Sequence, residues 1–93
     1  MPFVSNTLVC DLNVTGLHNV RLAVWESINH PGEWHWEMGV ESGRLVLAQG
    51  VTESQLAAQI ASQLAHESWL YSKHKDPNVV WNGPYNWQLK NQD

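Results

Sequence analysis

The segment between residues 33 and 41 carries the side chains best suited to chemistry in this sequence. Glu33, His35, Glu37 and Glu41 all fall on one parity, so a β-strand would place them on one face. Carboxylates four residues apart on a strand are about 13 Å apart, whereas the carboxylate pair of a glycosidase is separated by about 5–9.5 Å. The spacing argues against paired catalytic acids and favours an acidic surface that faces solvent or a basic partner.

Residue types that bind metals occur in and beside the same segment. His30, His35 and Glu37 could bring two or three ligands together, but no Cys or His spacing fits a structural zinc motif. The sequence has no glycine-rich phosphate loop, nucleophile elbow or HExxH motif. Cys10 lies in an apolar alternation, as an inert core thiol would. We therefore expect no enzymatic activity, no metal and no cofactor.

Tryptophan is the unusual component, with six among 93 residues. Trp34 and Trp36 have the parity opposite to that of the acidic residues, which predicts that they face the core. Trp25 falls on the outward face of the preceding predicted strand, and Trp69 lies on the predicted helix opposite its aliphatic stripe. Trp is enriched in protein interfaces because it anchors contact area. The predicted partner-binding surface comprises Trp25, Glu33, His35, Glu37, Glu41 and Trp69.

Aromatic and amide side chains alternate near the end of the sequence, within residues 76–93. Flat rings beside amide donors and acceptors could form a platform for a small ligand or a carbohydrate. This alternative site comprises Trp81, Asn82, Tyr85, Asn86 and Trp87.

Composition limits the class of protein. Nine acidic residues against five Lys and Arg give a net charge of −4, which argues against direct binding to a nucleic-acid backbone. A single cysteine cannot form an internal disulfide. No apolar run is long enough to span a membrane, and the first residues do not resemble a signal peptide. We expect one cytoplasmic domain over residues 1–93 that does not bind membranes.

Hydrophobic alternation predicts four strands joined by short turns into an antiparallel meander. Their approximate ranges are 7–14, 19–28, 33–41 and 44–49. In the last of them, Leu45 and Leu47 are expected to point inward and Ala48 outward.

The loop between the second and third predicted strands sets their register. His30-Pro31-Gly32 suits a three-residue hairpin loop whose glycine is left-handed. This loop would place Val24 opposite Met38 and Arg21 opposite Glu41. A shift by one residue would bury carboxylates and is excluded.

A helix is predicted over about residues 53–75. Thr52 is the expected N-cap, with Gln55 completing a capping box. The residues expected to face the sheet share one side at helical spacing. They are Leu56, Ala57, Ile60, Ala61, Leu64, Ser68 and Tyr71.

The predicted fold class is therefore α+β, a four-stranded antiparallel meander with one long helix on one face. The tail is expected to supply a short fifth strand near residues 85–89. The expected function is that of a small, acidic, non-enzymatic protein-binding module. It would resemble inhibitors of phages or mobile elements that occupy a basic, nucleic-acid-handling site on a host protein, such as a CRISPR or other defence effector. A homodimer through a sheet face or edge is the other expected partnership.

Overall fold

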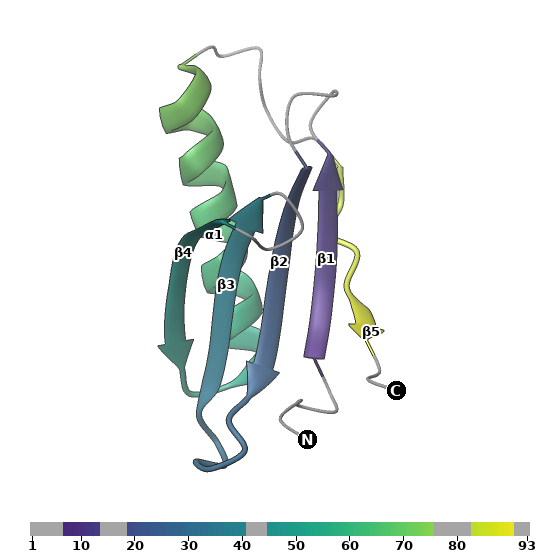
Figure 1. The fold of residues 1–93 in the computed structure, drawn as a ribbon, viewed down its shortest axis with the longest axis vertical. Coiled ribbons are helices and arrows are strands. Elements are labelled where there is room, and N and C mark those ends of the chain that lie inside the picture. Colours follow the sequence, from purple (N-terminus) through teal and green to yellow (C-terminus); the bar gives the residue numbers. More distant parts are fainter. Residues whose placement is uncertain (1–6, 14–18, 41–44, 76–82, 91–93) are drawn as a thin grey trace.

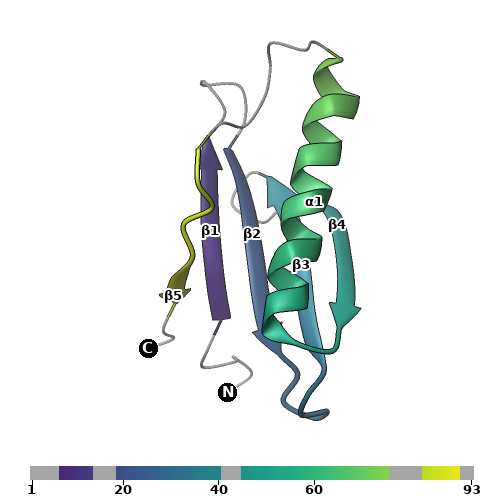
Figure 2. The same cartoon turned by 180° about the vertical axis from the view of Figure 1, so that it is seen from behind.

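The computed structural model describes residues 7–13, 19–40, 45–75 and 83–90. Within them, five strands form one antiparallel sheet and one helix packs on one of its faces (Figures 1 and 2). The elements are β1 (Thr7–Asn13), β2 (Asn19–Glu26), β3 (Trp34–Val40), β4 (Leu45–Thr52), α1 (Gln55–His74) and β5 (Gln88–Lys90). This confirms the predicted α+β class. Among the described residues, no helix is both long enough and apolar enough to cross a membrane.

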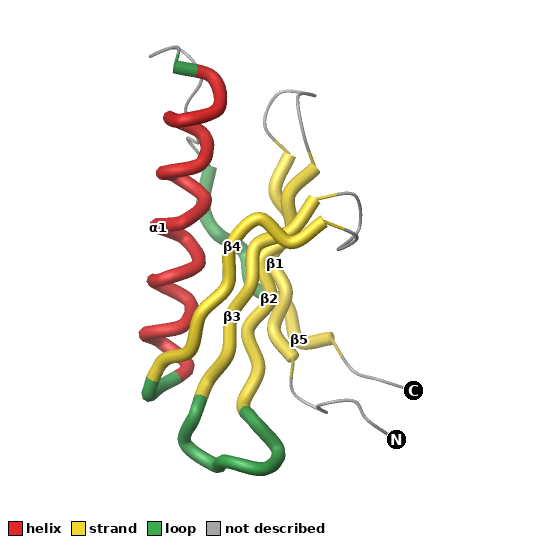
Figure 3. Tube along the Cα trace, turned by 60° about the vertical axis from the view of Figure 1, so that its left-hand side comes forward, coloured by secondary structure: helices red, strands yellow, loops and turns green. Residues whose placement is uncertain are grey.

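The sheet order is β4-β3-β2-β1-β5, so the predicted meander is extended on its β1 side. β5 runs antiparallel to β1 and pairs Leu89 with Leu8. The short fifth strand is therefore confirmed, beginning at Gln88. Figure 3 shows the helix as a second layer beside the sheet, and its packing partners are β2, β3 and β4.

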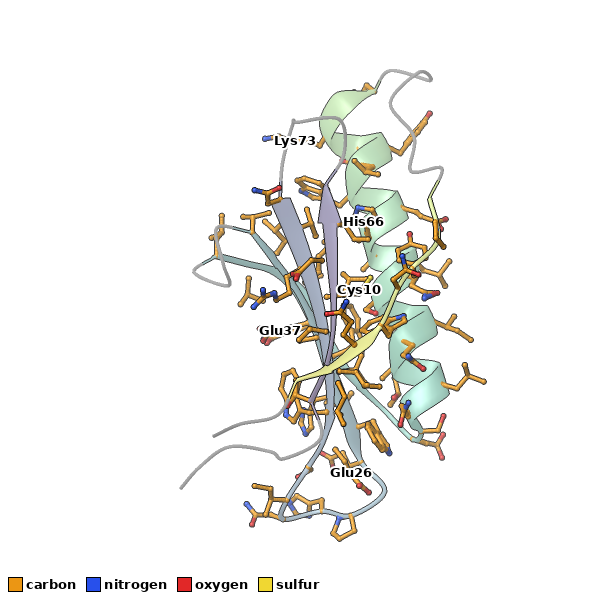
Figure 4. The ribbon with its side chains drawn as sticks, turned by 90° about the vertical axis from the view of Figure 1, so that its right-hand side faces the viewer. Cys10, Glu26, Glu37, His66 and Lys73 are labelled. Atoms are coloured by element: carbon orange, nitrogen blue, oxygen red, sulfur yellow. The ribbon has the colours of Figure 1, made fainter. Side chains whose placement is uncertain are left out.

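The centre of the core is formed by inward-facing side chains of β1, β2 and β3. It comprises Cys10, Leu12, Val20, Leu22 and Met38, each at most 2% exposed. Burial raises the pKa of the Cys10 thiol, which keeps it protonated and unreactive. Figure 4 shows Cys10 on the helix side of the sheet, as the alternation predicts.

The predicted register between β2 and β3 is wrong by two residues. Val24 lies opposite Trp36 rather than Met38, and Arg21 lies opposite Gly39. A shift of two leaves every side chain on its predicted face, because side chains alternate with a period of two. The error therefore changed cross-strand neighbours but not the assignment of the two faces.

The register differs because the β2–β3 loop is longer than three residues. Gly32 adopts a φ of 93°, and the Glu33 N–H donates to the His30 carbonyl at 3.0 Å. With Pro31 and Gly32 in the two central positions, these features match a type II turn. The carboxylate of Glu26 accepts a hydrogen bond from the Gly32 N–H at 2.8 Å and so holds the turn against the strand end. Ile28, the last residue of the predicted second strand, is exposed in this loop.

β4 contains a bulge that the sequence analysis missed. Gly39 pairs with Val46, but Met38 pairs with Ala48, so Leu47 is an extra residue on β4. Leu47 and Ala48 both pack against the core, whereas Leu45 is half-exposed at the sheet edge. The predicted outward orientation of Ala48 is therefore wrong. Leu45 pairs with Val40 on the inward face, as predicted, and is half-exposed because β4 is the edge strand.

The helix begins two residues later than predicted. Ser54 is the N-cap, and its hydroxyl accepts the Ala57 N–H at 3.1 Å. Thr52 instead ends β4 opposite Trp34, and its hydroxyl donates to the Ser54 carbonyl at 2.9 Å. The strand thus retains Thr52, which is why it does not cap the helix.

The side of α1 that faces the sheet is opposite to the predicted one. Ala58, Ser62, His66 and Leu70 are buried, at most 3% exposed. The large residues of the predicted inward stripe are exposed: Leu56 by 65%, Ile60 by 46%, Leu64 by 60% and Tyr71 by 76%.

The bulk of the sheet surface accounts for this orientation. Its inward face carries large side chains such as Trp36 and Met38, so the small residues Ala58 and Ser62 on α1 allow close packing. Ser62 is satisfied locally, because its hydroxyl donates to the Gln59 carbonyl at 2.8 Å. Amphipathicity alone could not identify the packed side, since α1 is apolar on both sides.

Candidate functional site

A stacked pair of rings lies on the sheet face opposite the helix. Trp25 on β2 pairs directly with His35 on β3, and their rings are parallel within 11° at a centroid separation of 5.7 Å. Both residues lie on the outward parity of their strands, as the sequence predicts. Pairing across neighbouring strands brings the two Cβ atoms close enough for this contact. The sheet therefore fixes a flat aromatic surface.

Two carboxylates flank this ring pair, one directly before β3 and one within it. The Glu33 carboxylate lies 3.1 Å from Nε2 of His35. Glu37 lies two residues beyond His35, between Ala23 on β2 and Gln49 on β4. Figure 4 shows Glu37 projecting from the side of the sheet that faces away from α1. The face thus combines an aromatic surface with negative charge.

The face is slightly hollowed beside these residues. A depression of about 290 Å³ is lined by side chains or backbone of β2, β3 and β4. Its lining comprises Trp25, His35, Trp36, Glu37, Gln49, Gly50 and Val51. It is small for a drug-sized ligand and has the scale of one or two side chains of a partner.

Arg21 lies on the same outward parity of β2 as Trp25, and its guanidinium is already paired with a carboxylate. The Arg21 guanidinium binds the Asp11 carboxylate at 2.6 Å, and this bond raises the pKa of Arg21. The predicted placement of Arg21 opposite Glu41 is wrong, because Arg21 pairs with Gly39 on β3 and with Asp11 on β1. Among the described residues, no Lys or Arg forms an ion pair with Glu33 or Glu37. The Glu37 carboxylate is therefore available to a partner, whereas the Glu33 carboxylate already contacts His35.

Not all of the predicted surface residues join this cluster. Trp25, Glu33, His35 and Glu37 come together, whereas Glu41 lies outside the described residues. Trp69 packs against the core beneath the helix, because α1 turns that side toward the sheet. We call the cluster of Trp25, Glu33, His35 and Glu37 the sheet-face site.

The aromatic tail is used largely for packing. The rings of Tyr85 and Trp87 are partly buried against the core, and Asn86 is exposed between them. Trp81 and Asn82 lie outside the described residues. Because Tyr85 and Trp87 contact the core, the described residues of the tail do not favour the alternative ligand platform. The described tail, residues 83–90, contacts the β1 edge and the helix side and so leaves the sheet-face site uncovered.

A buried polar contact joins the tail to the helix, and the sequence analysis did not find it. The Tyr85 hydroxyl lies 3.2 Å from Nδ1 of His66, and the two rings meet edge to face at 5.9 Å. The same hydroxyl lies 3.3 Å from the Glu67 carboxylate and 3.4 Å from the Gln63 carbonyl. Burial, assisted by the negative charge of Glu67, raises the pKa of Tyr85, so it remains a neutral hydrogen-bonding group.

This contact predicts that stability falls in mild acid. Burial lowers the pKa of His66 below its usual 6.5, and the nearby Glu67 offsets this only partly. The unfolded chain therefore binds the proton more readily, and the free energy of unfolding should fall as the pH drops below about 6.5. Urea melts between about pH 7.5 and 5.5 would measure the slope. His66→Gln should flatten it, whereas His30→Gln, at an exposed loop position, should not. An unchanged slope in His66→Gln would contradict the assignment.

The described residues contain no group of three or more His, Cys, Asp or Glu arranged to hold a metal ion. No protein-family model matches this chain, and no curated protein or solved structure matches it significantly.

Proposed function

We propose that the protein is a non-enzymatic binding module that holds a basic segment of a protein partner on the open face of its sheet. The observation that carries this proposal is the Trp25–His35 stack, flanked by the Glu33 and Glu37 carboxylates. Aromatic and acidic groups together favour a cationic side chain. The binding residues are those of the sheet-face site.

The chemistry of an arginine or lysine fits this site. A cation near an indole face is attracted by the ring's quadrupole, and the attraction is strongest for Trp among the aromatic residues. A carboxylate such as Glu37 adds a charge-assisted hydrogen bond, which can be bidentate with a guanidinium. The hollow of about 290 Å³ beside Trp25 gives such a side chain space to bind.

Charge supports a more specific form of the proposal. The chain has a net charge of −4, and in the described part of this face neither Glu33 nor Glu37 is paired with a Lys or Arg, although Glu33 contacts His35. Electrostatic complementarity would steer the face toward basic surfaces. The natural occupant would be the nucleic-acid-handling surface of another protein, blocked by an inhibitor of the kind encoded by phages or mobile elements.

Titration with an arginine-rich peptide, followed by fluorescence anisotropy at low salt, tests this function. A glycine- and serine-rich peptide of equal length is the peptide control. Trp25→Ala should weaken binding by roughly tenfold or more, as a hot-spot truncation does. Glu37→Lys should slow association, most clearly at low salt.

The matched charge control is Glu67→Lys, which makes the same charge change at an exposed position of α1, in the layer on the other side of the sheet. Its effect should be clearly smaller than that of Glu37→Lys. Equal losses in the two variants would mean that only net charge attracts the peptide. Equal affinity for the basic and neutral peptides would overturn the proposed function.

A further inference from the structure

The solvent-facing side of α1 is apolar over most of its length. Leu56, Ile60, Leu64 and Tyr71 are all exposed there, while the opposite side of the same helix packs on the sheet. A helix that is apolar on both sides is typical of burial on both sides. The described residues of the chain cover only one of them. We call the exposed side the outer helix face.

The residue spacing of the outer helix face suits packing against another helix. Ala57, Ile60, Leu64, Ser68 and Tyr71 follow one another at steps of three or four residues. Such spacing forms a continuous ridge that fits the grooves of a nearly parallel or antiparallel helix. The small residues Ala57 and Ser68 leave room for the larger side chains of a partner helix.

The charges at the two ends of α1 differ in sign and indicate what that partner is. Glu53 is exposed just before the helix and Lys75 is exposed at its end. Lys73 instead points to the sheet side of α1 (Figure 4). Between Glu53 and Lys73, Glu67 is the one fully charged residue of the helix. A second copy of α1 placed antiparallel would bring the acidic end of each helix beside the basic end of the other. Its dipole would also oppose the first.

We propose that two copies of this chain associate through their outer helix faces, with the α1 helices antiparallel about a two-fold axis. Leu64 lies midway between Glu53 and Lys75, so it would meet Leu64 of the second copy at the axis. Ala57 of each copy then faces Tyr71 of the other, matching a small residue with a large one. The surface is thus complementary to itself in both shape and charge.

The dimer differs from one formed through a sheet face or edge. Both sheets lie on the outside, so each sheet-face site remains open, on the side of the sheet shown by Glu37 in Figure 4. A 20-residue helix is about 30 Å long, which provides a small interface by the standards of permanent dimers. The association is therefore weak and depends on concentration.

Sedimentation velocity over about 5–300 µM protein tests the dimer, since weak complexes of this size have micromolar affinities. The wild type should shift from monomer toward dimer across this range. Leu64→Glu should remain monomeric, because it would place two carboxylates together at the axis. Leu89→Glu is the matched control, since Leu89 is also about half exposed but lies on β5. Circular dichroism would verify that both variants are folded.

Charge reversal distinguishes the antiparallel arrangement from any other. Glu53→Lys alone should weaken the dimer, and the double variant Glu53→Lys with Lys75→Glu should restore it. A wild type that stays monomeric throughout overturns the proposal, as does equal dissociation by Leu89→Glu and Leu64→Glu. Failure of the double variant to recover would overturn the antiparallel arrangement. None of these outcomes depends on peptide binding at the sheet-face site.

Discussion

Leu70→Ala should unfold the protein at a much lower urea concentration than the wild type, whereas Leu64→Ala should leave the transition almost unchanged. Leu70 is 3% exposed on the side of α1 that faces the sheet, and Leu64 is 60% exposed on the other side of the same helix. Truncation of a buried leucine removes apolar contacts and leaves a cavity, at a cost of about 2–5 kcal/mol. A leucine in solvent loses little on truncation, within about 0.5 kcal/mol.

The comparison uses the same substitution on two sides of one helix, so helix propensity cancels. Equilibrium urea melts at low micromolar protein, where the dimer is dissociated, would measure both midpoints. The hydrophobic pattern of the sequence predicts the opposite order, with Leu64 inside. A larger loss in Leu64→Ala than in Leu70→Ala would therefore show that α1 packs with its other side on the sheet.

Gly50→Ala should destabilise the protein by about 1–3 kcal/mol, as overpacking does, because the Trp36 indole occupies the space beside Gly50. A Cβ at position 50 would lie 2.6 Å from Nε1 of Trp36 and 2.8 Å from Cε2. Gly50 and Trp36 are opposite one another on β4 and β3, so the ring lies directly over the glycine. Trp36→Ala should cost up to about 3–5 kcal/mol, since it removes this large contact.

A double-mutant cycle isolates the contact between the two residues. Once Trp36 is replaced by Ala, the space above position 50 is free, and adding Gly50→Ala should cost little or even stabilise the strand. Gln49→Ala, on the opposite side of the same strand, controls for strand propensity. Additive losses for Gly50→Ala and Trp36→Ala in the urea melts would contradict the close packing of the indole on Gly50.

The sequence predicted the sheet faces well because they depend only on alternation. The inward set of Cys10, Leu12, Val20 and Leu22 is buried as its parity requires. The hairpin error did not disturb this result, since a two-residue shift preserves parity. The bulge at Leu47 is different, because inserting one residue reverses parity on one strand and has no clear signal in a single sequence.

The hydrophobic pattern could not predict which side of α1 packs on the sheet. Burial of Ala58 and Ser62 depends on how much space Trp36 and Met38 leave above the sheet, which is a property of the assembled layers. The largest apolar residues on the helix were therefore a misleading guide to its core side. Small residues such as Ala58 and Ser62 are a signal for close approach of a helix to a sheet, when the facing strands carry large side chains.

Part of the sheet-face site followed directly from parity. The outward positions of Trp25, His35 and Glu37 were predicted, but the stacking of Trp25 on His35 needed the observed register, which places them opposite each other. The contact between Tyr85 and His66 was missed because it joins segments that are distant in sequence, with no local pattern that pairs them.

The pairing of β5 with β1 has a consequence for how the chain folds. Val9 pairs with Gln88, so closing this edge joins segments separated by about eighty residues, an entropically costly step. The meander from β1 to β4 needs only short loops and can assemble first. During synthesis on a ribosome, β1 therefore waits with an unsatisfied outer edge until Gln88 has emerged from the exit tunnel. In that interval the unpaired edge of β1 can pair with a strand of a neighbouring chain. Once β5 has paired with β1, that edge is no longer exposed.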